Sequence, residues 1–338
     1  MAPQTSRWAI PLVAGLAAPV GLYMTFIFLG AFPFFQRQNE DKLQAEPHGF
    51  VEDFTSTESF RLLREDSNAR VVVLFHGNAG HIAQAIRPDS YHTLTDGSNY
   101  HVIAIDYRGF GKSTGTPSEA GLINDGAAAV NWVMNVAKVP SSRIVIMGQS
   151  LGTAVTSGVA EHFAMQGVEF AGVILVAGFS NLPTLLSRYT AAGYIPVLSP
   201  LRSIPPLLRF FQSFVTEKWY SADRLATVVG LTRTRLRLTL IHAKNDYEIP
   251  YSETDTLFKT AATSLLGTEL DDEDFAEWKR ERTVLRKDGT YVAVAQGGHD
   301  VVIREELVPY GGHNNVMMSS PVALAVMRSF DIQGEDAP

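Results

Sequence analysis

The chain has 338 residues, 46% of them hydrophobic and 19% charged, so it can bury a sizeable core and is not expected to be disordered. Its net charge of −7 gives no reason to expect a nucleic-acid partner. The absence of cysteine from the sequence excludes disulfides, thiolate metal sites and a cysteine nucleophile.

The N-terminal residues 1–37 are predicted to form a membrane anchor. From Trp8 to Phe35 the sequence has no charged residue, and an arginine flanks this stretch on each side. A run of about 20 apolar residues is enough to cross a bilayer. A cleaved signal peptide and a buried core helix are the alternatives, but the run is long for a signal peptide and stands outside the pattern that follows. Residues 38–49 are then a polar linker, and residues 50–338 form the globular domain.

Buried strands that alternate with helices indicate an α/β domain with a mainly parallel central sheet flanked by helices. Apolar runs place the expected strands at residues 70–75, 101–106, 144–147, 172–176, 236–242 and, as the last strand, 291–295. One helix is expected to begin at Pro117, with Thr116 as its N-cap and Glu119 completing a capping box, and a terminal helix is expected at Ser319–Phe330. The charged stretch 267–290 is expected to be solvated surface without a chemical role.

Residues 179–220 interrupt this alternation. Their first part, 179–216, is rich in proline and aromatic residues and contains three arginines but no acidic residue. Because the stretch falls between two sheet strands, we interpret it as a lid insertion that covers an acyl chain and touches lipid. The alternative is an ordinary apolar insertion that packs on the sheet. The arginines suggest an anionic head group on the substrate.

The motif Gly148-Gln149-Ser150-Leu151-Gly152 follows the third expected strand and precedes a stretch of small residues. This spacing suits a serine nucleophile on a sharp strand-to-helix turn, where the two glycines remove side chains that would collide. The turn also directs the backbone N–H of Leu151 toward a carbonyl under attack. The motif therefore predicts that Ser150 is a nucleophile, and an ordinary turn between a strand and a helix is the alternative.

An acid and a base are available further along the chain. Asp246 follows the fifth expected strand, where a carboxylate can orient an imidazole, and Glu248 is the competing acid. His299 and His313 each follow two glycines. We favour His313 as the general base because it lies in the loop before the terminal helix. His299 stays open because it follows the expected last strand more closely.

An oxyanion formed at the substrate carbonyl needs N–H donors. We expect Leu151 to supply one and Asn78, in the loop after the first strand, to supply the other. His76 in the same loop is interpreted as structural, and Asp106 with Arg108 as an internal pair that tethers a loop. We predict no cofactor and no metal ion.

These motifs together resemble a known family. The motifs are His76-Gly77-Asn78-Ala79-Gly80, Asp106-Tyr107-Arg108-Gly109-Phe110-Gly111, Gly115-Thr116-Pro117-Ser118-Glu119, the turn 148–152 and Gly312-His313-Asn314. They resemble the membrane-anchored monoacylglycerol and lysophosphatidylserine lipases of the α/β-hydrolase superfamily. The resemblance implies an α/β-hydrolase fold, a triad in the chain order Ser150, Asp246, His313, and a transmembrane helix in the endoplasmic-reticulum membrane. Protein depalmitoylases share two of the motifs but are anchored through cysteines, which this chain lacks.

We therefore predict a serine hydrolase that cleaves acyl esters of monoacylglycerols or lysophospholipids through an acyl-enzyme. Its expected partners are a lipid ester and the membrane that holds its N-terminal helix. A thioesterase or a peptidase on the same fold is the alternative enzyme. A non-catalytic scaffold is the alternative outside the enzymes.

Overall fold

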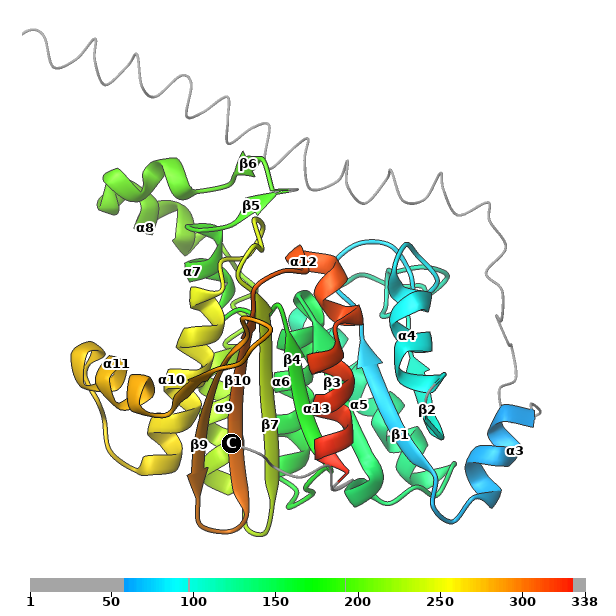
Figure 1. Cartoon of the computed structure of the whole chain (residues 1–338). Helices are drawn as coiled ribbons and strands as arrows, with labels where there is room; N and C mark the ends of the chain where they lie inside the picture. The colour runs from blue at the N-terminus through cyan, green and yellow to red at the C-terminus, as the bar shows by residue number, and fades with distance from the viewer. Residues whose placement is uncertain (1–57, 97, 192, 331–338) are drawn as a thin grey trace, which may run out of the picture. The chain divides into compact units, whose positions relative to one another are not determined.

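A computed structural model describes residues 58–96, 98–191 and 193–330 of the chain (Figure 1). The expected anchor at 1–37 and the expected linker at 38–49 lie outside the described residues. Within the part that is described, no helix has the length and apolar character that crossing a membrane requires.

An eight-stranded sheet forms the centre of the domain, in the order β2-β1-β3-β4-β7-β10-β9-β8. The first six strands in this order, which end with β10, pair in parallel. Strands β9 and β8 continue the sheet in antiparallel pairing. The strands are β1 Arg70–Phe75, β2 Tyr100–Ala104, β3 Ile144–Gln149, β4 Gly172–Val176, β7 Leu236–Ala243, β8 Thr283–Leu285, β9 Tyr291–Gly297 and β10 Val301–Val308. The expected mainly parallel sheet is confirmed.

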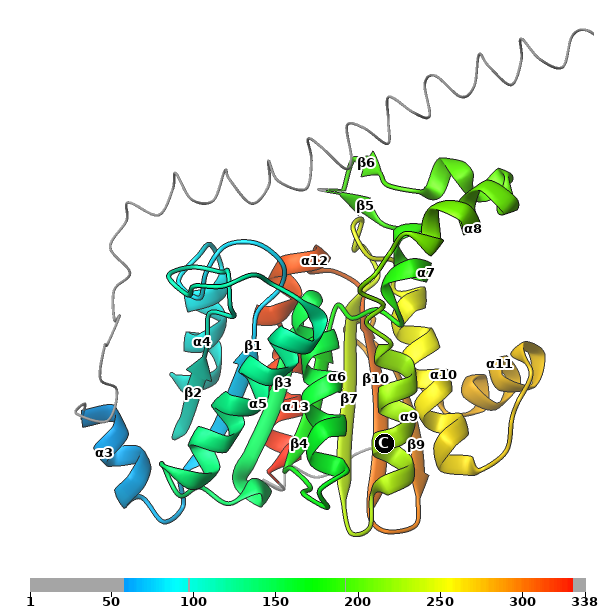
Figure 2. The ribbon, with the colours of Figure 1, turned by 180° about the vertical axis from the view of Figure 1, so that it is seen from behind.

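Helices cover both faces of this sheet (Figures 1 and 2). Alternate strand residues point to opposite faces, so Val71 and Val73 lie in one hydrophobic cluster while Val72 and Leu74 lie in the other. One face carries α4 Arg87–Thr95 and α13 Ser320–Ser329, and the other carries α5 Glu119–Asn135, α6 Leu151–Ala164, α9 Ser221–Leu231 and α10 Ser252–Leu266. The remaining helices include α3 Glu58–Glu65 and α11 Asp272–Glu281.

Strand β10 corrects the expectation that residues 291–295 form the last strand. It lies between β7 and β9, and its sequence Val-Val-Ile-Arg-Glu-Glu-Leu-Val carries charges where a buried strand is normally apolar. Both glutamates are buried but paired: Glu305 with Lys279, and Glu306 with Arg304 and Arg328. Lys279 therefore also departs from the solvated surface expected for 267–290.

Helix α5 begins two residues later than expected, at Glu119 and not at Pro117. Its N-cap is Ser118, not Thr116, and the Ser118 hydroxyl accepts the N–H of Gly121 at 3.1 Å. Glu119 does not complete a capping box, because its carboxylate accepts the N–H of Trp219 at 2.9 Å. Glu119 therefore binds Trp219, which is remote in sequence, and not a backbone N–H at the start of its own helix.

The expected pair of Asp106 and Arg108 is also wrong. Arg108 instead bonds Asp125 on α5, with Nη2 and Oδ1 2.7 Å apart. Asp106 accepts the backbone N–H of Ile82 at 2.8 Å and so holds the loop that follows β1. The tethering role of Asp106 remains, but with a different partner.

The expected lid region folds into short elements between β4 and α9. They are α7 Leu182–Leu186, β5 Thr190–Ala191, β6 Ile195–Pro196, the 3-10 helix η4 Ser199–Ser203 and α8 Pro205–Ser213. Figures 1 and 2 show that β5, β6 and α8 project beyond the carboxyl ends of the parallel strands, at the same end as α12 Gly312–Asn315.

Candidate active site

Ser150 occupies a strained turn between β3 and α6. Its backbone angles are φ 54° and ψ −121°, in a region that costs a non-glycine residue about 1–3 kcal/mol. A Cβ on Gly148 would lie 2.1 Å from the carbonyl oxygen of Gly152, and one on Gly152 would lie 1.9 Å from that of Phe75. Only glycine fits at positions 148 and 152, as the motif predicted.

Three side chains from distant parts of the sequence meet at this turn. His313 Nε2 lies 2.9 Å from the hydroxyl oxygen of Ser150, and His313 Nδ1 lies 2.7 Å from Asp246 Oδ2. Ser150 follows β3, Asp246 follows β7, and His313 lies on α12. All three positions are at the carboxyl ends of the parallel strands, the edge at which such sheets gather functional groups.

The carboxylate of Asp246 is completely buried and has four donors. Its Oδ1 accepts the backbone N–H groups of Glu248 at 2.8 Å and Ile249 at 3.0 Å. Its Oδ2 faces both His313 and His242 Nε2, the latter at 3.1 Å. Burial opposes ionisation, but the hydrogen bonds from His242 and His313 outweigh it and hold the pKa of Asp246 well below its usual range. Asp246, and not Glu248, is therefore the ionised carboxylate that is hydrogen-bonded to His313.

His242 is a contact that the sequence analysis missed. Its side chain is fully buried at the end of β7, and its Nε2 lies 3.0 Å from the carbonyl oxygen of Ile249 as well as close to Asp246. Because Nε2 faces two acceptors, it carries the hydrogen, and Nδ1 accepts from the hydroxyl of Thr254 at 2.7 Å. A histidine four residues before the acid, at the end of a buried strand, was the available signal.

The environment of His313 favours a charged imidazole. Burial lowers its pKa, but the hydrogen bond to Asp246 and the charges of Asp246 and Glu248 raise it by more, so the pKa of His313 is raised from its usual value. An imidazole in this setting can take a proton from Ser150 and hold it as a stabilised imidazolium.

Two amide side chains hold the loop that carries His313. Gln149 Nε2 donates to the backbone carbonyl of His313 at 3.0 Å and to Asn314 Oδ1 at 3.1 Å. Asn245 Oδ1 accepts the N–H of Gly312 at 2.9 Å. The neighbours of Ser150 and Asp246 in sequence thus fix the position of the imidazole.

The alternative base, His299, lies elsewhere. It occupies the turn between β9 and β10, next to Asp300, whose carbonyl accepts the N–H of Leu236 at the amino end of β7. Ser150 lies at the opposite end of the parallel strands. The structure therefore brings His313, and not His299, to the serine.

The expected oxyanion donors lie beside Ser150. Leu151 is the first residue of α6, and a Cβ built on Gly77 would lie 3.2 Å from the Cβ of Ser150, so the loop with Asn78 passes the serine closely. The side chain of Asn78 is exposed. Its backbone N–H is therefore the group to consider as a donor.

Arg87 and His76 fix the peptide that precedes Asn78. Arg87 donates to the carbonyls of Gly77 at 3.2 Å and Ala79 at 2.9 Å, and His76 Nδ1 lies 2.7 Å from the Gly77 carbonyl. Burial, with the charge of Arg87, lowers the pKa of His76 to about 3, so its imidazole is neutral and donates from Nδ1. In a trans peptide the N–H points opposite to the C=O, so the N–H of Asn78 points away from Arg87.

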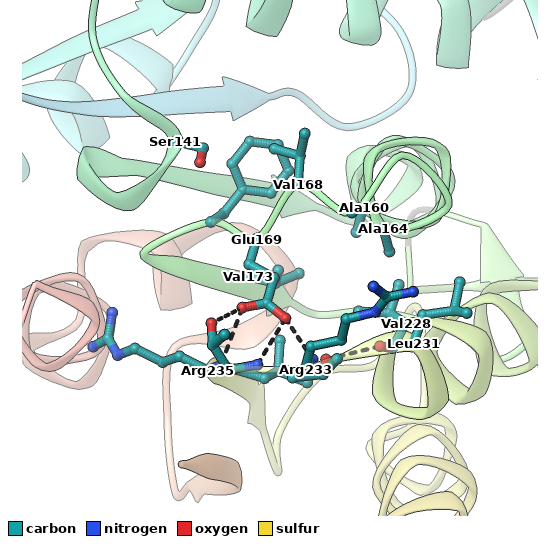
Figure 3. Close-up of a pocket in the computed structure, with 15 residues that line it drawn as sticks. Ser141, Ala160, Ala164, Val168, Glu169, Val173, Val228, Leu231, Arg233 and Arg235 are labelled. Carbon is teal, nitrogen blue, oxygen red and sulfur yellow. Dashed lines mark hydrogen bonds between the residues drawn. The ribbon is translucent and has the colours of Figure 1, made fainter. Parts of the chain in front are cut away.

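A separate cavity of about 320 Å³ lies at the amino ends of β4 and β7, far from Ser150 (Figure 3). In the lining of this cavity, Glu169 accepts the backbone N–H groups of Thr234 at 3.0 Å and of Arg235 at 3.1 Å. The amides that could bind an anion there are already occupied. Among the residues that the structure describes, no group of three or more potential ligands could hold a metal ion.

The sequence also matches known proteins. The model of the alpha/beta hydrolase family matches residues 72–325. The uncharacterized protein YfhR of Escherichia coli strain K12 is 28% identical over 246 residues, which cover 72% of this chain and 71% of YfhR. The lysophosphatidylserine lipase ABHD12 of Mus musculus is 29% identical over 198 residues, which cover 59% of this chain and 47% of ABHD12. The matched region thus spans about half the length of that lipase.

Among solved structures, Est1E from Butyrivibrio proteoclasticus, with ferulic acid bound, is similar with a TM-score of 0.47 and 12% identity over 79% of this chain and 90% of Est1E. The family match rests on the sequence and covers well over half of the chain. The chain therefore belongs to the alpha/beta hydrolase family.

Proposed function

We propose that the protein is a serine hydrolase of lipid esters, with Ser150 as the nucleophile, His313 as the general base and Asp246 as the acid that orients it. The observation that supports this proposal most directly is the pair of contacts made by His313: its Nε2 lies 2.9 Å from Ser150 Oγ, and its Nδ1 lies 2.7 Å from Asp246 Oδ2. These lengths are within the range required for direct proton transfer from the hydroxyl and for a charge-assisted hydrogen bond to the acid.

Ester cleavage then proceeds in two stages. His313 takes the hydroxyl proton as Ser150 attacks the carbonyl, and Asp246 stabilises the imidazolium that results. The N–H groups of Leu151 and Asn78 receive the oxyanion. His313 returns the proton to the leaving alcohol, which leaves the acyl group on Ser150. Water, deprotonated by His313, attacks this acyl-enzyme and releases the fatty acid.

A monoacylglycerol or a lysophospholipid is the proposed substrate class. The relative ABHD12 carries the name of a lysophosphatidylserine lipase, which supports a lipid substrate here by similarity. The insertion 179–220 supports it too, because an arginine-containing apolar segment is suited to cover an acyl chain as a lid. We also propose that residues 1–37 anchor the protein as a single-pass helix in the endoplasmic-reticulum membrane, on the basis of the uncharged stretch from Trp8 to Phe35.

Product release from a panel of substrates tests the proposal. The full-length protein and Ser150→Ala are offered lysophospholipids, monoacylglycerols, an acyl thioester and a peptide side by side. We expect turnover of the lipid esters that Ser150→Ala lacks. Preferred turnover of the thioester or the peptide favours the alternative enzymes, and no turnover of any substrate by a folded protein leaves only the scaffold.

A further inference from the structure

Helix α8 exposes an aromatic face. The exposed fraction is 45% for Ile204, just before the helix, 56% for Phe210 within it and 58% for Phe214, just after it. No residue of the helix Pro205–Ser213 is buried. Phe210 and Phe214 are four residues apart, and their ring centroids are 5.0 Å apart. We call Phe210 and Phe214 the aromatic face. Exposed apolar side chains that are grouped in this way, and not scattered singly, mark interaction sites.

The surroundings of the aromatic face are cationic. Arg202 and Arg209 are exposed on either side of Ile204, and neither forms an ion pair with any residue that the structure describes. The sequence from 179 to 216 contains no acidic residue. Apolar and aromatic side chains flanked by uncompensated arginines are the composition of a segment that enters the interface of an anionic bilayer.

The aromatic face lies on the part of the fold that projects furthest at the catalytic end. Figures 1 and 2 show α8 beyond the carboxyl ends of the strands, the end at which α12 carries His313. The helix is attached to α7 through Gln212, whose Nε2 donates to the carbonyl of Pro183 at 2.7 Å. A surface that α8 contacts therefore lies at the same end of the fold as Ser150.

We propose that α8 docks on an anionic phospholipid bilayer. The aromatic face enters the acyl boundary, and Arg202 and Arg209 pair with the lipid phosphates and carboxylates. This inference deepens the proposed lipid-directed function, because it places the proposed active site beside a membrane that supplies its substrate. It requires no catalytic step, so docking and hydrolysis can fail separately.

A fluorescent probe at position 213 tests the proposal in the full-length chain. Because the protein has no cysteine, Ser213→Cys gives a single labelling site next to the aromatic face. Met165→Cys is the matched control, since Met165 is 67% exposed at the C-terminal end of α6, at the amino ends of the strands. Both carry a nitrobenzoxadiazole label and are reconstituted in phosphatidylcholine vesicles with and without phosphatidylserine, with nitroxide-labelled lipid as the quencher.

We expect a shorter emission wavelength and strong nitroxide quenching at position 213, larger with phosphatidylserine, and neither change at position 165. The pair Phe210→Glu with Phe214→Glu abolishes both changes. The pair Arg202→Gln with Arg209→Gln removes the effect of phosphatidylserine. Leu285→Glu, on a strand residue that is 58% exposed elsewhere, leaves the signal at 213 unchanged, and thermal unfolding confirms that each variant is folded.

Equal quenching at 213 and 165, or quenching that persists in the Phe210→Glu, Phe214→Glu pair, overturns the proposal. A probe at 213 that is shielded from aqueous iodide but not quenched by lipid nitroxide also overturns it, because protein then covers the face. The same measurement in the Ser150→Ala background is expected to give the same docking signal, which separates this proposal from the proposed hydrolysis.

Discussion

His242 is expected to influence the pH range of activity through Asp246. In His242→Leu, Asp246 Oδ2 loses the donor at 3.1 Å and keeps only His313. A buried hydrogen bond to a charged group contributes about 1.5–3 kcal/mol, and one pKa unit corresponds to about 1.4 kcal/mol. The pKa of Asp246 should therefore rise by about one to two units, from a value well below its usual range. Asp246 remains ionised at neutral pH.

The loss of that donor changes His313 in a defined direction. Asp246 becomes a stronger acceptor for His313, so the pKa of His313, which is already raised, rises further. Only the neutral imidazole can accept the Ser150 proton, so activity is lost as the pH falls through this pKa. The acidic limb of kcat/KM should therefore move to higher pH in His242→Leu.

The assay is kcat/KM against pH with a soluble short-chain nitrophenyl ester. His242→Gln, which keeps a donor near the position of Nε2, should move the limb back toward that of the wild type. Thr254→Val is the structural control, because it removes the hydroxyl 2.7 Å from His242 Nδ1 and does not touch Asp246. A limb that stays in place or moves to lower pH while the melting temperature falls refutes the reasoning and makes His242 a purely structural residue.

Three further changes address the acid, the oxyanion loop and the turn. Asp246→Asn should lower kcat on the same ester about 10³–10⁴-fold, because an amide no longer selects the correct imidazole tautomer, and a loss under tenfold contradicts this role. Arg87→Met should lower kcat by up to about 10²-fold with little change in KM, because the carbonyl of Gly77 then keeps only His76 as a donor and is held less firmly; a change confined to KM argues against it. Gly152→Ala should prevent folding, since its Cβ would lie 1.9 Å from a carbonyl oxygen. Gly298→Ala, with no atom within 4 Å, should change the unfolding free energy by less than about 0.5 kcal/mol, and similar melting curves for the two variants would be evidence against the packing argument.

Much of the fold could be predicted because its buried strands are apolar. The expected strands at 70–75 and 172–176 match β1 and β4 residue for residue. Strand β10 could not be found in this way, because Glu305 and Glu306 break the apolar pattern. Their partners come from α11, from α13 and from β10 itself, and only the folded chain brings the first two of these close.

The candidate site, like the fold, could be predicted only in part from the sequence. Ser150, Asp246 and His313 stand in motifs that depend on local backbone geometry, so the sequence could single them out. The open choice between His299 and His313 arose from the missing strand: without β10, His299 seemed to follow the last strand. The supporting contacts of His242, Arg87 and Gln149 join segments that no motif connects, and only the tertiary structure reveals them.

Another misjudgement concerned the start of α5. Thr116-Pro117-Ser118-Glu119 offers two possible caps, and local rules alone favoured Thr116. Glu119 is engaged by Trp219 and Arg224, which lie in a segment about a hundred residues away, so it is not free for a capping box. Local capping rules fail where a tertiary partner binds the capping side chain more strongly.

Covalent labelling of Ser150 tests the central claim most directly. The full-length protein is treated with a fluorophosphonate, and the modified residue is mapped by mass spectrometry in the wild type, His299→Ala and His313→Ala. We predict one adduct on Ser150 that forms equally fast in the wild type and His299→Ala and is almost absent in His313→Ala. No adduct on folded wild-type protein, or labelling that depends on His299 instead, would contradict the proposed assembly of serine, histidine and aspartate.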